Sequence, residues 1–209
     1  IVQRLAKSGG HQMVALGINP LDKSRDISDQ LQHFRYPLKR GNTKGVHPLV
    51  METETKVIRA EACVSAAEQL KKKGFEPDLI CAHPGWGEPL FLKAVWPDTP
   101  LLCYQEFFYN EYGFDSNFDP EFQDERGWYP QAKLLMKNAY LRLTLDQADW
   151  NVSPTHFQAS SFPKHHQSQI SVIHDGVDLQ RAIPNPSVAP LALPDGTVLK
   201  KGQPIVTFV

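Results

Sequence analysis

The amino-acid sequence predicts an α/β fold, an open and mostly parallel β-sheet with helices on both faces, followed by a C-terminal β-hairpin. Short apolar strands alternate with helical segments along most of the 209 residues, which is typical of βαβ units. The stretch Pro100–Tyr104 is apolar almost without interruption, as in parallel strands that are covered on both sides. Pro194-Asp195-Gly196, between two apolar stretches, predicts the hairpin turn.

The first part of the chain reads as half of a βαβ unit. Residues 1–7 have a helical pattern that Gly9-Gly10 ends, because glycine supplies the left-handed turn found after helices. Met13–Ile18 follows as a short apolar strand, and His33–Lys39 as a second one. The chain begins without methionine and inside a helical pattern, so we expect a first strand to precede residue 1.

A long amphipathic helix is predicted over Glu52–Lys73. Acids stand early in the segment and Lys71 to Lys73 stand at its end, as the helix dipole prefers, and Gly74 closes it. Small or apolar residues recur at helical spacing, at Val57, Ala60, Val64, Ala67 and Leu70.

The middle of the chain continues the alternation. A buried strand at 78–82, a short helix at Pro89–Val95 and the strand Pro100–Tyr104 come in succession. The loop after Tyr104 runs for more than twenty residues, and loops of that length usually carry function or are disordered.

The last third adds two strands and the hairpin. Strands are predicted at 149–153 and 169–173. A short helix at 154–162 lies between them, and a turn at 174–178 follows the second strand. The preceding helix has one apolar face, formed by Ala132, Leu135, Met136, Ala139, Tyr140 and Leu143. A fresh strand is expected at Ile205–Val209. We therefore expect residues 1–185 to form the main domain, and residues 186–209 to form an interdomain hairpin and the first strand of a further domain.

Composition excludes several classes of protein. A formal charge of −1 gives no field that would attract nucleic acid, so no nucleic-acid partner is expected. No apolar run approaches the length of a membrane span, and no signal peptide is recognisable. The odd number of cysteines, Cys63, Cys81 and Cys103, all in apolar segments, predicts buried reduced thiols and a cytoplasmic location.

Ligands of open parallel sheets bind at the carboxyl ends of the strands, so the residues that follow each strand are the candidates for a site. These are His83 to Glu88, Gln105 to Tyr109, Ser153 to Thr155 and His174 to Gly176. Polar, aromatic and glycine residues are thus expected along one edge.

The loop after residue 82 allows two interpretations. His83 and Glu88 could bind a ligand together with backbone N–H groups, while Gly85 and Gly87 let the ligand approach closely. Alternatively, the loop is a glycine turn with a capping acid and with Trp86 packed on the core.

The other candidates also leave alternatives. Glu106 either faces a ligand or pairs with an arginine such as Arg126. The aromatics that follow it, Phe107, Phe108, Tyr109, Tyr112 and Phe114, either stack on a sugar or lipid-like acceptor or form the core of the long loop. His174 and Asp175 either form a turn or contact a ligand. His156, His165 and His166 lack acids at metal spacing, so we expect surface histidines and no metal site.

Three segments together resemble a known family. They are DLICAHPGWGEPLFLKAVWPDTPLLCYQEFFY, the FDPEF stretch of the long loop, and ISVIHDGVD with its hairpin tail. This order is similar to the N-terminal domain of a family-4, group 1 glycosyltransferase of GT-B architecture. The HPGWGE loop and the IHDGVD segment are its most specific parts, and the resemblance covers residues 13–209.

The resemblance implies a Rossmann-like domain and a retaining transfer of a sugar from a nucleotide-sugar to an acceptor glycan or lipid-linked sugar. It implies no cofactor and no essential metal, and it allows a peripheral membrane contact of the full-length protein. The nucleotide-sugar would bind mainly to a C-terminal domain beyond residue 209, so we expect the chain alone to be inactive.

The site residues that the resemblance and the edge position suggest fall in two groups. Glu106 is the candidate catalytic residue, although the chain departs from its relatives here: they often have a histidine that contacts the donor sugar after the strand equivalent to 100–104, and this chain has Gln105-Glu106. The candidate substrate-binding residues are His83, Gly85, Trp86, Gly87, Glu88, Gln105, Tyr109, His174 and Asp175.

Two other functions are consistent with the same residues. One is a saccharide-binding module without chemistry. The other is a hydrolase that uses Glu88 and Glu106 as its two carboxylates, which requires that they lie within reach of one substrate and are not held by arginines.

Overall fold

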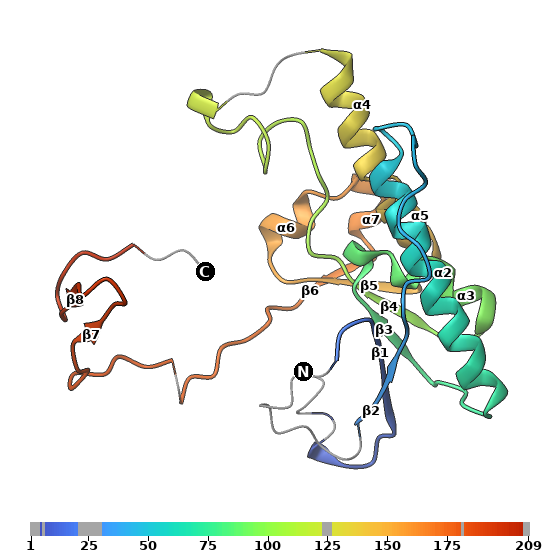
Figure 1. The fold of residues 1–209 in the computed structure, drawn as a ribbon, viewed down its shortest axis with the longest axis horizontal. Helices are drawn as coiled ribbons and strands as arrows, with labels where there is room; N and C mark the ends of the chain where they lie inside the picture. Colours follow the sequence, from blue (N-terminus) through green and yellow to red (C-terminus); the bar gives the residue numbers. More distant parts are fainter. Residues whose placement is uncertain (1–4, 6, 21–30, 123–126, 181, 207–209) are drawn as a thin grey trace. The chain divides into compact units, whose positions relative to one another are not determined.

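A computed structural model describes residues 5, 7–20, 31–122, 127–180 and 182–206. The chain forms two compact units, residues 1–174 and residues 175–209. The first unit holds the parallel strands and the helices, and the second holds a short antiparallel hairpin (Figure 1).

The strands of the first unit form two parallel sheets. A two-stranded sheet has the order β1-β2, and a four-stranded sheet has the order β3-β4-β5-β6. This confirms the predicted α/β class with parallel strands. The strands are β1 (Met13–Gly17), β2 (Leu31–Arg35), β3 (Ile80–Ala82), β4 (Leu101–Tyr104), β5 (Trp150–Ser153) and β6 (Ile170–Val172).

Helices of very different length connect the strands. The α-helices are α2 (Met51–Lys72), α3 (Leu92–Val95), α4 (Trp128–Lys137), α5 (Ala139–Gln147), α6 (His156–Ser160) and α7 (Lys164–Gln167). The 3₁₀ turns are η1 (Pro84–Trp86), η2 (Glu88–Phe91) and η3 (Pro120–Phe122). The sequence did not indicate α7.

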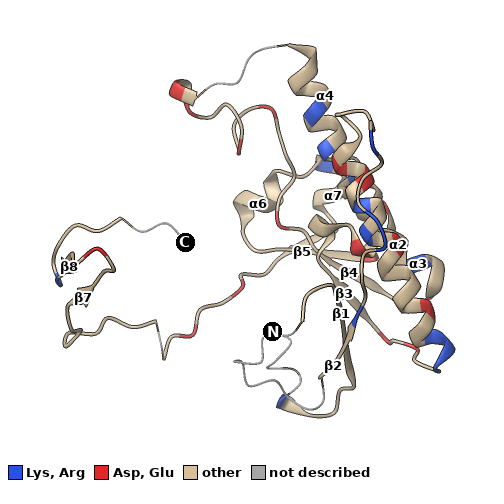
Figure 2. Ribbon diagram, viewed as in Figure 1, with Lys and Arg blue, Asp and Glu red and all other residues tan. Residues whose placement is uncertain are grey.

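Helix α2 is the long helix that the sequence predicted. Glu52 and Glu54 lie in its first turn and Lys71 and Lys72 in its last, where Figure 2 shows the basic end of the helix. Its buried surface is wider than the predicted face, because Ile58, Cys63 and Ala66 are buried as well as Ala60, Ala67 and Leu70. The helix therefore has contacts on more than one side.

One core connects the two sheets through α2. Ala66, Ala67 and Leu70 of the helix are buried, and Val14 of β1 and Ile80 of β3 both pack against this cluster. Burial of apolar surface on a shared helix thus fixes the two sheets within the first unit.

The four-stranded sheet has one buried face and one face that is partly exposed. Leu101 and Cys103 of β4 are 1% and 0% exposed, and their neighbours in register on β3 are Ile80 and Ala82. Cys81 lies between these two and points to the opposite face, because side chains alternate along a strand. The prediction of a buried Cys81 was therefore wrong: this thiol is exposed.

Several predicted elements differ from the structure in detail, and two of these differences have a clear physical cause. The strand predicted at His33–Lys39 lies at Leu31–Arg35, because Pro37 has no N–H for the ladder and ends it soon after Tyr36 donates to the carbonyl of Gly17. The helix predicted through Met136 and Ala139 is divided into α4 and α5 at Asn138, which is buried.

The hairpin of the second unit is confirmed, with β7 (Leu191–Ala192) antiparallel to β8 (Val198–Leu199). Ile205 and Val206 are exposed and outside any strand, and the rest of the strand predicted there, like most of the helix end at 1–7, falls outside the described residues. No helix in the described ranges combines the length and the apolarity that crossing a membrane requires.

Candidate functional site

The candidate site lies where β3 and β4 end side by side. His83 follows β3, Glu106 lies two residues after β4, and Nε2 of His83 is 3.2 Å from Oε2 of Glu106. The two side chains are 37% and 61% exposed, so solvent and solutes reach both. The sequence indicated each residue separately, and the parallel pairing of β3 with β4 brings them together.

His83 is held by its own loop. Its Nδ1 accepts a hydrogen bond of 3.1 Å from the backbone N–H of Gly85, at the start of η1. Its ring also lies 5.6 Å from the ring of Tyr104, the last residue of β4. The imidazole is thus oriented before any ligand is bound.

The two glycines of the HPGWGE loop are required by protein atoms. A Cβ on Gly85 would lie 2.7 Å from Cε1 of His83, and a Cβ on Gly87 would lie 2.6 Å from the backbone oxygen of Lys56. Gly87 also has φ of 97°, a conformation that favours glycine. The sequence predicted that a ligand would lie close to these two glycines. In the structure, His83 lies close to Gly85 and α2 lies close to Gly87.

Glu88 is bound into the fold. Its Oε1 accepts hydrogen bonds from Nη2 of Arg59, at 3.0 Å, and from the hydroxyl of Tyr36, at 3.2 Å. Oε2 of Glu88 is buried and has no hydrogen-bond partner among the described residues. Glu88 thus makes an ion pair with Arg59 and caps no turn that the structure describes, so the predicted capping role is not found.

The partners of the two carboxylates also decide against the two-carboxylate hydrolase. That hypothesis required that neither carboxylate be held by an arginine, and Arg59 holds Glu88. Glu106 is paired with His83 instead, while Arg126, the alternative partner that the sequence offered, lies outside the described residues.

Trp86 is exposed next to two cations. Its side chain is 58% exposed, and its ring lies 5.6 Å from Nζ of Lys56 and 5.3 Å from the guanidinium of Arg59. The alternative in which Trp86 packs into the core is therefore wrong. Its position leaves an aromatic surface beside the loop that holds His83.

Lys56 is a component of this edge that the sequence did not indicate. Its Nζ donates to the backbone oxygen of Gly85 at 2.7 Å and lies 5.1 Å from the ring centre of Tyr140. Burial lowers the pKa of this amine below its usual range. A half-buried lysine in an amphipathic helix gives no signal that distinguishes it from a solvated one, so only the tertiary packing identifies it.

Gln105 does not belong to the exposed edge, which corrects its prediction as a substrate-binding residue. Its side chain is fully buried, and its Nε2 donates to Oδ1 of Asn151 on β5 at 2.9 Å. Alternation along the chain explains the difference, since Gln105 and Glu106 point in opposite directions.

Tyr109 lies close to the site but is partly covered. The backbone N–H and carbonyl of Tyr109 are both bound by the side chain of Asn138, and Nζ of Lys137 lies 3.4 Å from its ring centre. Burial raises the pKa of its phenol above the usual range, and the nearby charge of Glu52 adds to this effect.

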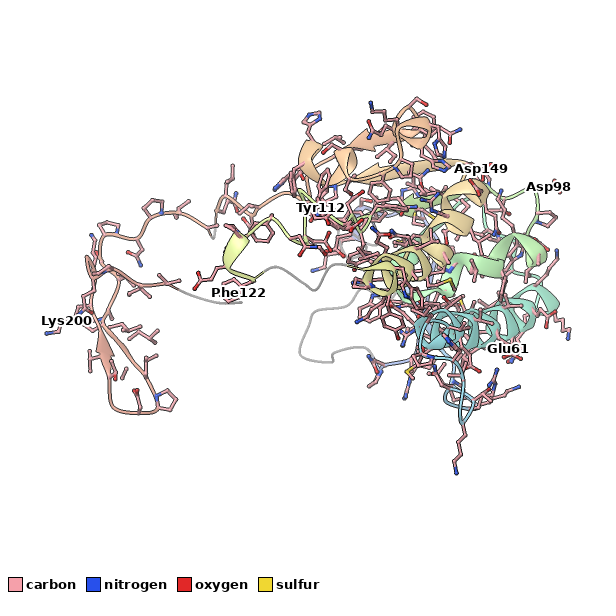
Figure 3. The ribbon with its side chains drawn as sticks, turned by 90° about the horizontal axis from the view of Figure 1, so that it is seen from above. Glu61, Asp98, Tyr112, Phe122, Asp149 and Lys200 are labelled. Atoms are coloured by element: carbon pink, nitrogen blue, oxygen red, sulfur yellow. The ribbon has the colours of Figure 1, made fainter. Side chains whose placement is uncertain are left out.

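The long loop is anchored by an aromatic cluster. Phe107, Phe114 and Phe157 have ring centres between 5.3 and 6.2 Å apart, so part of the loop forms its own core. Phe118 and Phe122 are 69% and 74% exposed, and Figure 3 labels Phe122 at the short 3₁₀ turn η3. The packing of Phe107 and Phe114 fits the prediction of a loop core, and the stacking of aromatics on an acceptor stays a prediction.

The remaining histidines and acids lie elsewhere. His174 ends the first unit, Asp175 begins the second, and both are exposed. His166 is only 8% exposed and lies 3.5 Å from Asp146, so its prediction as a surface histidine was wrong. Within the described ranges, no three side chains of His, Cys, Asp or Glu cluster as metal ligands would.

Comparison with known proteins assigns the chain to a family. A search of curated proteins found no match. The family model described as "Glycosyl transferase family 4 group" matches residues 9–182, which include every strand of the first unit. The chain therefore belongs to the glycosyl transferase family 4 group, as its HPGWGE and IHDGVD segments implied.

Proposed function

We propose that this chain forms the acceptor side of a retaining glycosyltransferase, which moves a hexosyl group from a nucleotide-sugar to an acceptor glycan or lipid-linked sugar. The observation that carries the proposal is the exposed His83–Glu106 pair, at the edge of the sheet where α/β domains bind ligands. Membership of the family supports the reaction class.

The reaction breaks the bond between the anomeric carbon and the phosphate oxygen and forms a bond to an acceptor hydroxyl oxygen. The nucleoside diphosphate leaves with the electron pair, and the hydroxyl proton is transferred to the departing phosphate. We assign Glu106 the role of accepting a hydrogen bond from a sugar hydroxyl, which orients that hydroxyl for attack. A carboxylate that only accepts hydrogen bonds suits a partner rich in O–H donors.

Neighbouring groups suit a saccharide as well. Trp86 offers a flat, exposed ring, and the long loop carries further exposed aromatics such as Phe118 and Phe122. We propose that these contact the acceptor, with a peripheral membrane contact of a longer protein where the acceptor is lipid-linked. We assign the reaction to the cytoplasm, with which the free thiols Cys63 and Cys103 are compatible.

We also propose that the nucleotide-sugar binds mainly to a further domain, without an essential metal, so that both parts are needed to align donor and acceptor and to exclude water. The 209-residue chain is therefore expected to show no turnover with nucleotide-sugars. Detectable transfer or hydrolysis by the purified chain would contradict this.

An NMR titration of the chain tests the binding part of the proposal. Added oligosaccharides should shift the amide signals of His83, Gly85 and Glu106, whereas nucleoside diphosphates should produce weak shifts or none. Glu106→Gln should reduce the saccharide shifts, and Glu61→Gln, at an exposed position of α2, is the control that should leave those at His83 unchanged. Saccharide shifts confined to regions away from His83 and Glu106 would overturn the assignment of the site.

A further inference from the structure

The hydrogen bonds of His83 determine which of its nitrogens carries the proton. The backbone N–H of Gly85 can only donate, and it points at Nδ1 of His83 at 3.1 Å. Nδ1 must therefore present its lone pair, and the neutral ring carries its proton on Nε2.

The same ring then donates to Glu106. Nε2 lies 3.2 Å from Oε2 of Glu106, within hydrogen-bond distance, and a carboxylate only accepts. We propose that His83 is a positioning residue, whose Nε2–H, fixed in that tautomer by the N–H of Gly85, holds the carboxylate of Glu106 for its ligand. What Glu106 then does with a sugar hydroxyl rests on the proposed function.

Exposure explains why Glu106 needs such a partner. Its side chain is 61% exposed, and a glutamate in that environment samples several rotamers unless a hydrogen bond restricts it. His83 is the more rigid member, because η1 fixes one nitrogen and Tyr104 packs 5.6 Å from the ring. The Gly85 backbone therefore fixes the orientation of the imidazole, and the imidazole in turn restricts the rotamers of the Glu106 carboxylate.

This arrangement also excludes a role for His83 as a general base. A general base needs a ring nitrogen with a free lone pair, and here Nδ1 is occupied by Gly85 while Nε2 bears the proton. Glu106 is consequently the group that meets a hydroxyl, and His83 acts through it.

Nitrogen-15 NMR of the histidine side chains in the whole 209-residue chain tests the proposal without any assay of activity. We expect the spectrum of His83 to show an unprotonated Nδ1 and a protonated Nε2, with a coupling across the hydrogen bond between Nδ1 and the Gly85 amide nitrogen. A proton on Nδ1, or an equal mixture of the two tautomers, would overturn the proposal.

Gly85→Ala and Gly41→Ala form a matched pair of variants. A Cβ at position 85 would lie 2.7 Å from Cε1 and 3.0 Å from Nδ1 of His83, so the ring must turn away and the coupling must disappear. Gly41 has open space around it and no positive φ, so its alanine variant should keep both signals. A coupling that survives in Gly85→Ala would contradict the assigned geometry.

Substitutions of His83 separate the positioning role from a merely structural one. His83→Gln retains an N–H donor near the position of Nε2 and should keep the saccharide response at Glu106, whereas His83→Leu, which has no donor, should lose it. In a complete enzyme, His83→Leu should lower kcat by up to about 100-fold with a smaller change in KM, and His83→Gln should restore most of it. Equal loss in both variants would show that His83 serves the fold alone.

The two hypotheses fail separately. If the tautomer and the coupling are found but saccharides do not bind at Glu106, the proposed function is wrong and the pairing of His83 with Glu106 stands. If saccharides bind at Glu106 but Nδ1 carries the proton, the positioning role of His83 is wrong and the acceptor site stands.

Discussion

At the scale of single residues, the glycines of the HPGWGE loop show how a motif can be required by the protein itself. Gly87 has φ of 97°, and its backbone lies against that of Lys56. A Cβ at this position would be too close to the Lys56 backbone unless one of the two segments moved. Gly85 leaves space for the ring of His83. Both glycines therefore support the site indirectly, by letting the loop lie against α2 and letting His83 turn toward Glu106.

Gly87→Ala should lower the free energy of unfolding by about 3 kcal/mol, since the positive φ and the contact with the Lys56 oxygen are both unfavourable for alanine. Gly74→Ala is the matched control, because φ is 85° there but nothing lies within 4 Å of the added Cβ. The Gly74→Ala variant should lose only about 1 to 2 kcal/mol of its free energy of unfolding, which urea unfolding measures. Equal losses in the two variants would show that Lys56 moves away freely.

Cys81 should be the cysteine that reacts in the folded protein, because it is exposed and the other two are buried. Burial raises the pKa of Cys63 and Cys103 to about 12. Cys81 is exposed at its surface but partly covered, and this partial desolvation raises the pKa of its thiol as well, so its reaction with iodoacetamide should be slow at neutral pH and faster in alkali. Mass spectrometry should find one adduct in the native chain and three after unfolding. Modification of Cys103 without unfolding would contradict the buried face of β4.

At the scale of the elements, strands and helices with a local signature were predicted well. The acid-first, lysine-last pattern of α2 and the continuous apolar run of β4 depend on neighbours in sequence, so the sequence alone locates them. The boundary between α4 and α5 lies at Asn138, whose side chain binds the backbone of Tyr109, a residue far away in the sequence. No local sequence pattern indicates such a contact.

The candidate site was predictable only in part for the same reason. Its position at the carboxyl ends of β3 and β4 follows from the general architecture of parallel sheets, and His83 and Glu106 were both indicated. Their partners depend on which strands are adjacent and in which register, so the sequence linked His83 with Glu88, whereas the structure gives Glu88 to Arg59. Gln105 was misplaced because its face of the chain depends on the residue at which β4 ends.

Asp149 joins three elements and predicts a pH effect. It precedes β5, accepts from the N–H of Leu101 at the start of β4 at 2.7 Å, and pairs with Lys93 of α3 at 2.6 Å. The hydrogen bond from Lys93 and the one from Leu101 hold the pKa of this carboxyl below its usual range. A lowered pKa means that the folded state favours the charged form. This stabilisation is therefore present at pH values above the pKa of Asp149 in the unfolded state, and it is lost as the pH falls through its pKa in the folded state.

Asp149→Asn should therefore lower the free energy of unfolding at neutral pH by about 1 kcal/mol, a value reduced for the solvent screening of this half-exposed pair. The difference between wild type and variant should shrink in acid and vanish below the lowered pKa. Urea unfolding at a series of pH values measures it. A difference that stays constant from neutral to strongly acidic pH would show that the charge of Asp149 is not involved.

At the scale of the whole molecule, the cores described above lie in the first unit. The two clusters of buried apolar residues fall between Tyr36 and Phe162, and the described residues from 175 onward are almost all exposed. Strands β7 and β8 have only two residues each. Stability should therefore reside in residues 1–174.

A chain that ends at His174 should unfold at nearly the same temperature as the 209-residue chain, since little apolar surface is buried by the second unit. Circular dichroism during heating measures this. Because about 1 kcal/mol shifts Tm by roughly 2 to 4 °C in a protein of this size, a decrease larger than that would show that the hairpin unit stabilises the first unit.

The division of the parallel strands between two sheets has a consequence for the behaviour of the chain in solution. A single six-stranded sheet would have two edges, whereas the separate sheets β1-β2 and β3-β4-β5-β6 have four among the strands that the structure describes. Each edge presents a row of backbone donors and acceptors that another extended polypeptide can complete. An edge that no other segment covers can therefore pair with an extended strand of a second polypeptide.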